Sequence, residues 1–120
     1  MALSVKLYIL DEKGEKYMGA GVLWLLEGIS KTGSLLASAK SMGLSYSKAR
    51  NMIEHAEEAL GRPLIERQKG GAEHKGATLT HFAESYLELY KIFQDSTKTY
   101  ALERYNEFES SVRNLMEEEK

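Results

Sequence analysis

The sequence contains no cysteine, which excludes several kinds of site at once. Without thiols the chain cannot carry a disulfide framework, a thiolate zinc site or a cysteine nucleophile. Long apolar runs are also absent: the longest covers about residues 22–26, far short of the roughly 20 residues that cross a bilayer. The N-terminal segment has acidic residues directly after a short apolar stretch, which makes a poor secretory signal. We therefore expect a cytoplasmic protein that does not enter a membrane.

Catalytic and metal-binding motifs are equally scarce. The three histidines, His55, His74 and His81, are separated by 19 and 7 residues, and this spacing matches no zinc signature. The chain has no HExxH motif, no phosphate-binding loop and no nucleophile elbow. We therefore expect a protein that is not an enzyme and that has no catalytic residues, no metal site and no cofactor.

The charge is unevenly distributed along the 120 residues, which are enough for one domain. The overall net charge of −2 argues weakly against a nucleic-acid partner. However, residues 40–76 carry seven basic and five acidic side chains, whereas residues 77–120 carry five basic and nine acidic ones. A DNA-binding surface depends on the local charge more than on the total. The middle of the chain is therefore the segment best suited to contact DNA.

The first half of the chain predicts a hairpin followed by three helices. Residues 3–9 alternate apolar and polar side chains, and residues 15–18 can return as a second strand after a turn, which gives a hairpin over residues 3–18. Apolar residues at helical spacing predict a helix over residues 20–31, with Trp24 expected in the core. Ser34 and Ser45 are expected to cap two further helices, the second of them over residues 46–60.

The second half predicts a small β-ribbon and a long helical segment. Residues 64–67 and 77–79 are compatible with strands, and a glycine-containing loop at 68–76 joins them. Thr80 is expected to cap a helical segment whose polar stretch at residues 94–99 predicts a kink or break. The sequence does not decide whether residues 100–120 form a separate helix, continue the same long helix or are partly disordered. The fold class is mainly α with small β elements: a winged helix-turn-helix in one domain, with core residues 20–79 and a C-terminal helical dimerisation segment at 80–116.

Two helices joined by a short turn with glycine, here residues 42–45, form the signature of a helix-turn-helix. The third helix then presents its N-terminal end to a major groove, where Arg50 can bond guanine and Asn51 can bond adenine. The alternative for Lys48 and Arg50 is that they are ordinary solvated charges. The predicted DNA-contacting residues are Ser34, Ser45, Tyr46, Ser47, Lys48, Arg50, Asn51, Arg67, Lys69, His74 and Lys75.

An apolar stripe on the long C-terminal segment predicts either internal packing or a contact between two copies of the chain. Its members recur at helical spacing, which places them along one side of a helix. We predict a homodimer interface formed by Phe82, Tyr86, Leu89, Phe93, Tyr100 and Phe108.

Several short motifs resemble a known family. They are TGSL at 32–35, GLSY at 43–46, LIER at 64–67, GG at 70–71 and LT at 79–80. Together they resemble the N-terminal DNA-binding domain of the molybdate-dependent transcriptional regulators (ModE type), relatives of the LysR-type winged helices. The resemblance covers about residues 3–95. It implies that residues 46–60 are the recognition helix, that 68–76 are the wing, and that the long C-terminal helix joins a dimer.

The chain departs from that family at three points. The family usually has an aromatic residue where this chain has Arg50, and its wing is richer in glycine. Family members also carry molybdate-binding β-barrel modules, whereas only helical pattern follows Leu79 here. We therefore do not infer molybdate binding from the resemblance, and we expect a stand-alone DNA-binding protein.

The functional prediction is a sequence-specific regulator of transcription that binds double-stranded DNA as a homodimer. The alternative is a winged-helix module for protein–protein interaction, or an architectural module, without specific DNA binding. The sequence does not identify the operator, the regulated genes or any small-molecule or oxyanion effector.

Overall fold

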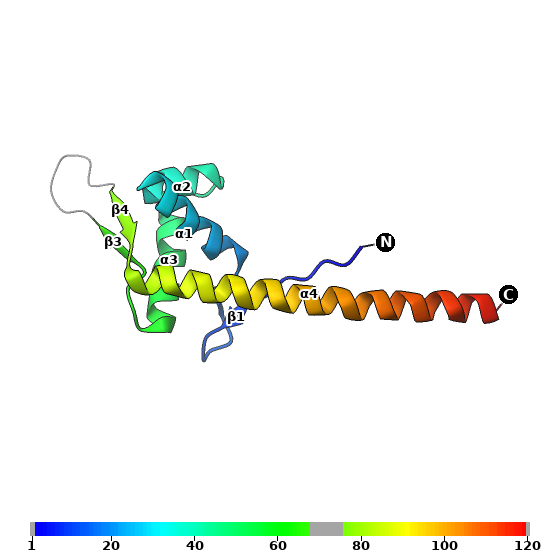
Figure 1. The fold of residues 1–120 in the computed structure, drawn as a ribbon. Coiled ribbons are helices and arrows are strands. Elements are labelled where there is room, and N and C mark those ends of the chain that lie inside the picture. Colours follow the sequence, from blue (N-terminus) through cyan, green and yellow to red (C-terminus); the bar gives the residue numbers. More distant parts are fainter. Residues whose placement is uncertain (1, 68–75, 120) are drawn as a thin grey trace. The chain divides into compact units, whose positions relative to one another are not determined.

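The computed structural model describes residues 2–67 and 76–119 (Figure 1). These residues divide into two compact units, one formed by residues 6–88 and the other by residues 2–5 and 89–119. The elements follow in the order β1 (Ile9–Leu10), β2 (Lys16–Met18), α1 (Ala20–Thr32), α2 (Leu35–Ser41), α3 (Tyr46–Leu60), β3 (Ile65–Arg67), β4 (Ala77–Leu79) and α4 (His81–Glu118).

The larger unit is built around three helices, and Figure 1 shows the β3–β4 ribbon beside them. Each helix has one apolar side that is removed from solvent, as the helical spacing of the apolar residues predicts. These sides meet in a common core with residues from β2, β4 and the start of α4. The most deeply buried apolar residues of this core are Met18, Leu25, Leu26, Ile29, Ala39, Ala49, Ile53, Ala56, Leu64, Ala77 and Ala83.

Local hydrogen bonds set where the helices begin and end. The Ser34 hydroxyl accepts a bond of 3.0 Å from the Ala37 amide at the start of α2, and the Ser45 hydroxyl accepts one of 3.1 Å from the Lys48 amide at the start of α3. Each bond satisfies an amide that has no partner inside its helix. Gly61 ends α3 in the left-handed conformation, with a φ of +69°. The predicted caps and the bounds of α3 are therefore confirmed.

Helices α1 and α2 approach closely where a glycine faces a serine. Ser38 is buried, and its hydroxyl donates a bond of 2.7 Å to the carbonyl of Leu25 in α1. Gly28 leaves the room for this contact, because a Cβ built on it would lie 2.9 Å from the Cβ of Ser38. The space for this close approach therefore comes from α1.

Hydrogen bonds tie both ends of the β3–β4 ribbon to the helices. Its strands pair antiparallel, with Ile65 opposite Leu79 and Arg67 opposite Ala77. The Glu57 carboxylate of α3 accepts a bond of 2.8 Å from the amide of Leu64, just before the ribbon. At its other end, the Ala77 amide donates to the carbonyl of Gly33 at 2.9 Å. The ribbon is thereby fixed to both α3 and the α1–α2 turn.

The structure corrects the predicted N-terminal strand. Only Ile9 and Leu10 form β1, and they pair with β2 across a bulge, whereas residues 3–8 are not in a strand. The reason is that β2 has only three residues before Gly19, which precedes α1. A longer first strand has no partner in the hairpin, so the apolar alternation of residues 3–9 overstated its length.

The structure also corrects the predicted break at residues 94–99, because α4 is one continuous helix of 38 residues. Neither glycine nor proline occurs between residues 81 and 118, and polar side chains alone do not interrupt a helix. Residues 100–118 are therefore a continuation of the same helix. None of the helices in residues 2–67 and 76–119 has an apolar stretch long enough to cross a membrane.

Candidate nucleic-acid interface

The turn between α2 and α3 has a defined backbone geometry. Gly43 adopts a φ of +70°, and its amide donates a bond of 3.1 Å to the carbonyl of Lys40. The amide of Leu44 donates to the carbonyl of Ala39 at 2.9 Å. A side chain at position 43 would strain this left-handed conformation, which glycine adopts freely. The turn directs the chain from α2 into the Ser45 cap of α3, as the sequence predicts.

Helix α3 divides into a buried face and an exposed face. Ala49, Ile53 and Ala56 are fully buried and hold the helix on the core. The predicted contact residues at its N-terminal end lie on the opposite side, and all are exposed: Ser45, Tyr46, Ser47, Lys48, Arg50 and Asn51. No acidic residue lies in the first turn of α3. Because a helix N-terminus carries a partial positive charge, this end of α3 favours an anionic partner.

Arg50 has an acidic neighbour on its own helix. Its guanidinium Nε lies 3.8 Å from the Glu54 carboxylate, and both side chains are about half exposed. Such an exposed pair is worth at most about 1 kcal/mol, so it does not hold the guanidinium firmly. Arg50 can leave Glu54 when a stronger anionic or base partner is offered.

The remaining predicted contact residues lie on the ribbon and at the start of α2. Ser34 is half-buried and forms an isolated antiparallel bridge with Gly76, next to β4. Arg67 is exposed at the end of β3. Lys69, His74 and Lys75 lie outside the described residues.

Two residues of the larger unit were missed or misplaced by the sequence analysis. Lys40 is exposed in the last turn of α2, just before the helix-turn-helix turn, and charge alone could have pointed to it. Trp24, expected in the core, is 59% exposed. It lies on the side of α1 away from Leu25, Leu26 and Ile29, which face the core.

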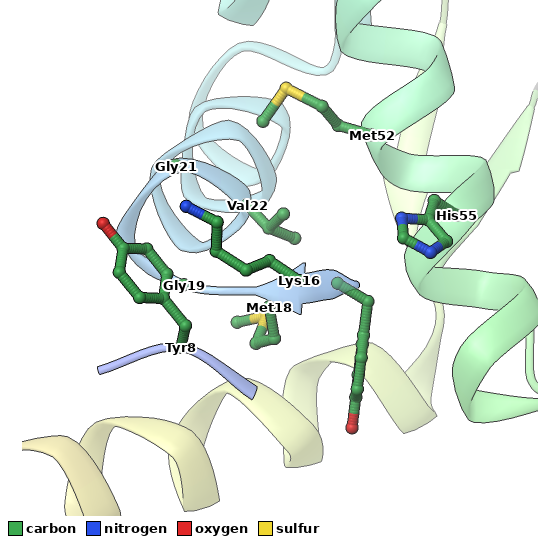
Figure 2. Close-up of a pocket in the computed structure, with 9 residues that line it drawn as sticks. Tyr8, Lys16, Met18, Gly19, Gly21, Val22, Met52 and His55 are labelled. Atoms are coloured by element: carbon green, nitrogen blue, oxygen red, sulfur yellow. The ribbon is translucent and has the colours of Figure 1, made fainter. Parts of the chain in front are cut away.

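The hairpin side of the unit contains a small cavity of about 220 Å³. Figure 2 shows Tyr8, just before β1, and Lys16 of β2 at its edge, with Val22 of α1 and Met52 of α3 nearby. The Lys16 ammonium lies 4.1 Å from the centre of the Tyr8 ring, a favourable cation–π arrangement. The cavity is mostly apolar and does not include the predicted contact residues of α3.

The hairpin turn also contacts α3 through a hydrogen bond between a carboxylate and an imidazole. His55 Nε2 lies 2.9 Å from Asp11 Oδ2, although the two residues are 44 positions apart. This hydrogen bond, together with the backbone amides of Glu15 and Lys13, lowers the pKa of Asp11 below its ordinary value of 3.8. No local motif in the sequence indicates this contact.

The predicted dimer residues on α4 fall into two groups. Phe82 and Tyr86 stack with their ring centroids 5.9 Å apart, and both are half-buried. The other four are exposed within their own unit and are Leu89 (67%), Phe93 (46%), Tyr100 (61%) and Phe108 (64%). Ile92, which the sequence analysis omitted, is 66% exposed.

Known proteins share both the sequence pattern and the fold. The chain is 37% identical over 70 residues to the transcriptional regulator ModE of Haemophilus influenzae, covering 58% of this chain and 28% of that protein. It is 34% identical over 82 residues to the molybdenum-pterin-binding protein MopB of Rhodobacter capsulatus, covering 68% of this chain and 30% of that protein. The chain thus spans less than a third of the length of these relatives.

The fold is shared with the protein in the crystal structure titled CbnR_DBD-DNA complex. The TM-score is 0.57 at 24% identity, over 72% of this chain and 95% of that one. The profile of the family described as bacterial regulatory helix-turn-helix protein, lysR family, matches residues 23–84. This match covers most of α1, all of α2 and α3, the ribbon and the start of α4, and more than half of the sequence. The chain therefore belongs to the lysR family of bacterial regulatory helix-turn-helix proteins.

Proposed function

We propose that this chain is a transcription regulator that binds double-stranded DNA in a sequence-dependent manner, with α3 in the major groove. The observation that carries the proposal is the division of α3 between a buried apolar face and an exposed polar, basic N-terminal end. A relative that is 37% identical over 70 residues is named as a transcriptional regulator, and a structural neighbour is titled as a complex with DNA.

The residues on the exposed end of α3 suit both parts of DNA recognition. Arg50 can donate two hydrogen bonds to the O6 and N7 atoms of guanine, and Asn51 can pair with adenine. Lys48, the hydroxyls of Ser45 and Ser47 and the helix N-terminus suit phosphate oxygens. We therefore assign base preference to Arg50 and Asn51 and general affinity to the groups around them.

The β3–β4 ribbon serves as the wing in this proposal. Arg67 lies on its described part, and the sequence places Lys69, His74 and Lys75 in the loop beyond. Cationic groups there suit the phosphate backbone or an adjacent minor groove. Ser34 is assigned to the backbone side of the interface, because it caps the start of α2 and bridges to Gly76, just before β4.

We further propose that the chain acts as a homodimer joined through α4. The exposed side chains of Leu89, Phe93, Tyr100 and Phe108 recur at intervals of 4, 7 and 8 residues, which keeps them near one side of the helix. A dimer with two recognition helices reads two half-sites about 34–36 Å apart, or a multiple of that spacing. Its site is then a near-palindrome.

The test is fluorescence anisotropy with a labelled random duplex and duplexes from the region upstream of the coding sequence, at about 50–200 mM salt. We expect binding that weakens steeply with salt and that prefers one duplex. Arg50→Ala and Asn51→Ala should relax the preference, whereas Lys69→Ala should weaken binding to every duplex. Arg62→Ala, beyond the other end of α3, is the matched control.

Two outcomes separate this proposal from its alternatives. Intact affinity and preference in Arg50→Ala would show that α3 does not read the bases. Absence of binding at low salt would favour a winged-helix module that contacts proteins instead. Because the described residues after Thr80 form one helix, we expect added molybdate to leave the affinity of this chain unchanged.

A further inference from the structure

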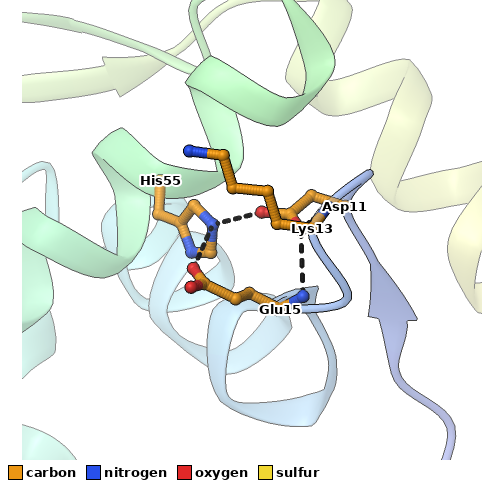
Figure 3. A network of polar contacts seen from close by, with 4 residues as sticks. All are labelled: Asp11, Lys13, Glu15 and His55. Carbon is orange, nitrogen blue, oxygen red and sulfur yellow. Dashed lines mark hydrogen bonds and ion pairs between the residues drawn. The ribbon is translucent and has the colours of Figure 1, made fainter.

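Three side chains with metal-ligating atoms meet where the hairpin turn contacts α3. They are Asp11 and Glu15, on either side of the turn between β1 and β2, and His55 of α3. Figure 3 shows the two carboxylates converging on the imidazole. His55 Nε2 lies 2.9 Å from Asp11 Oδ2 and 3.8 Å from Glu15 Oε2. One ligand atom from each residue lies within 4.8 Å of the other two.

Asp11 is held in place independently of His55. Its Oδ1 atom accepts hydrogen bonds of 2.9 Å from the backbone amides of Lys13 and Glu15. These bonds close the turn and leave Oδ2 directed at the imidazole, with only 17% of the Asp11 side chain exposed. A carboxylate oriented in this way by its second oxygen resembles the oriented ligands of metal sites, whose outer partners fix the ligand before the metal arrives.

The distances between the three groups fit a small divalent cation. Zinc bonds to imidazole nitrogen and carboxylate oxygen measure about 2.0–2.2 Å. Two ligands at that length and at tetrahedral or octahedral angles lie roughly 3–3.5 Å apart. The contact between His55 and Asp11 already has about this length. The Glu15 carboxylate lies 3.8 Å from His55 Nε2 and within 4.8 Å of the other ligand atoms, so it has to move closer to complete the site. The Glu15 side chain is 68% exposed and is free to make that shift.

The surroundings also favour a cation and leave room for water ligands. The three groups open onto a groove of about 530 Å³ at the surface. Besides Asp11 and Glu15, this groove is lined by the carboxylates of Glu12 and Glu58, against the one ammonium of Lys13. Three protein ligands with an open side are the usual arrangement for a zinc ion that keeps water in its remaining positions.

We propose that Asp11, Glu15 and His55 bind a divalent transition-metal ion of the zinc type, which clamps the β1–β2 hairpin onto α3. The imidazole selects against magnesium and calcium, which prefer oxygen ligands alone. The sequence analysis expected no metal because histidine spacing carries no zinc signature, and it could not see ligands 40 and 44 residues apart. The proposal concerns the larger unit alone and does not rest on DNA binding.

The experiment is isothermal titration calorimetry of Zn²⁺ into the purified, metal-stripped chain, with Mg²⁺ as the comparison ion. We expect one Zn²⁺ per chain and no comparable binding of Mg²⁺. His55→Gln and Glu15→Gln should each weaken Zn²⁺ binding by about tenfold or more, since each removes a direct ligand. His81→Gln removes an exposed histidine at the start of α4 and is the matched control, which should bind as the parent does.

A second measurement separates loss of the ligand from loss of the fold. Far-ultraviolet circular dichroism of Glu15→Gln should match that of the parent, because the Glu15 side chain is 68% exposed. Zn²⁺ should shift the NMR signals of the His55 imidazole but not those of His81. Binding of Zn²⁺ that survives both His55→Gln and Glu15→Gln, or no saturable binding to the parent chain, would overturn the proposal.

Discussion

Ser38 of α2 lies against Gly28 of α1, and its hydroxyl donates to the carbonyl of Leu25 one turn earlier in α1. Glycine inside a helix ordinarily costs about 1 kcal/mol relative to alanine. Here it allows α2 to lie close enough for a buried hydroxyl to find a backbone acceptor. The contact joins the first two helices of the unit, and α3 follows α2 directly.

We expect Gly28→Ala to destabilise the chain by about 1–3 kcal/mol, in spite of the higher helix propensity of alanine. The added methyl group would overlap Ser38, and separating the helices costs packing. Chemical denaturation in urea measures the change. Gly21→Ala in the same helix is the matched control, because its Cβ would meet only the flexible end of Met52 at 3.4 Å. Equal stability of the two variants would show that α2 moves aside freely.

The hydrogen bond from His55 and those from the backbone amides of Glu15 and Lys13 lower the pKa of Asp11. A carboxyl whose pKa is lower in the folded state stabilises the fold above its unfolded value, and this contribution is lost as pH falls through the lowered pKa. We therefore expect Asp11→Asn to be less stable than the parent near neutral pH. The difference in unfolding free energy should shrink as pH falls below about 4.

Asparagine keeps an acceptor for the turn amides, so this substitution tests the charge of Asp11 rather than the shape of the turn. Glu12→Gln, which removes an exposed carboxylate in the same turn, is the charge-matched control. Urea unfolding at a series of pH values provides the measurement. A stability difference between parent and Asp11→Asn that persists unchanged to low pH would contradict the assignment.

Glu54→Gln tests whether the ion pair with Glu54 competes with DNA for the Arg50 guanidinium. The exposed pair at 3.8 Å is worth at most about 1 kcal/mol, so its loss should raise DNA affinity by up to about fivefold. Fluorescence anisotropy at fixed salt measures this gain. Glu58→Gln removes the same charge near the far end of α3 and should give a smaller gain. Equal gains in DNA affinity for the two variants would mean that net charge, and not the release of Arg50, sets the affinity.

Phe93→Glu combined with Tyr100→Glu tests the proposed dimer. Both rings are exposed within their own unit, so the substitutions should leave the helix intact while placing charges in the interface. We expect a dimer for the parent and a shift toward monomer for the variant in sedimentation velocity. Thr99→Glu, an exposed neighbour, should sediment as the parent does. A monomeric parent, or a dimeric variant, would place the interface elsewhere.

Sequence patterns predicted the helix caps correctly, but they were wrong about the length of the first strand and the continuity of α4. The Ser34, Ser45 and Thr80 caps are confirmed by bonds to the amide three residues later, because such bonds depend only on neighbouring residues. The long first strand was wrong because a strand needs a partner, and β2 supplies only three residues. The break in α4 was wrong because polarity was taken for a helix stop.

The candidate interface was predictable to the extent that it is local. The exposed residues of α3 follow from the period of the helix once its buried side is known. Arg67 at the end of β3 follows from the predicted ribbon in the same way. The pairing of Arg50 with Glu54 is also local, because residues four apart are neighbours on a helix. The exposure of Trp24, in contrast, depended on which face of α1 the rest of the chain covers.

The sequence by itself determined the order of elements, the caps, the glycine turn and the polar end of α3, since hydrogen bonds and periodicity within a few residues specify all of them. Only the tertiary structure decided that Asp11 and Glu15 meet His55 and that Gly28 receives Ser38. These contacts join separate elements, and their partners have no fixed spacing along the chain. They form because burial of the common apolar core brings the elements together, and no local pattern records the result.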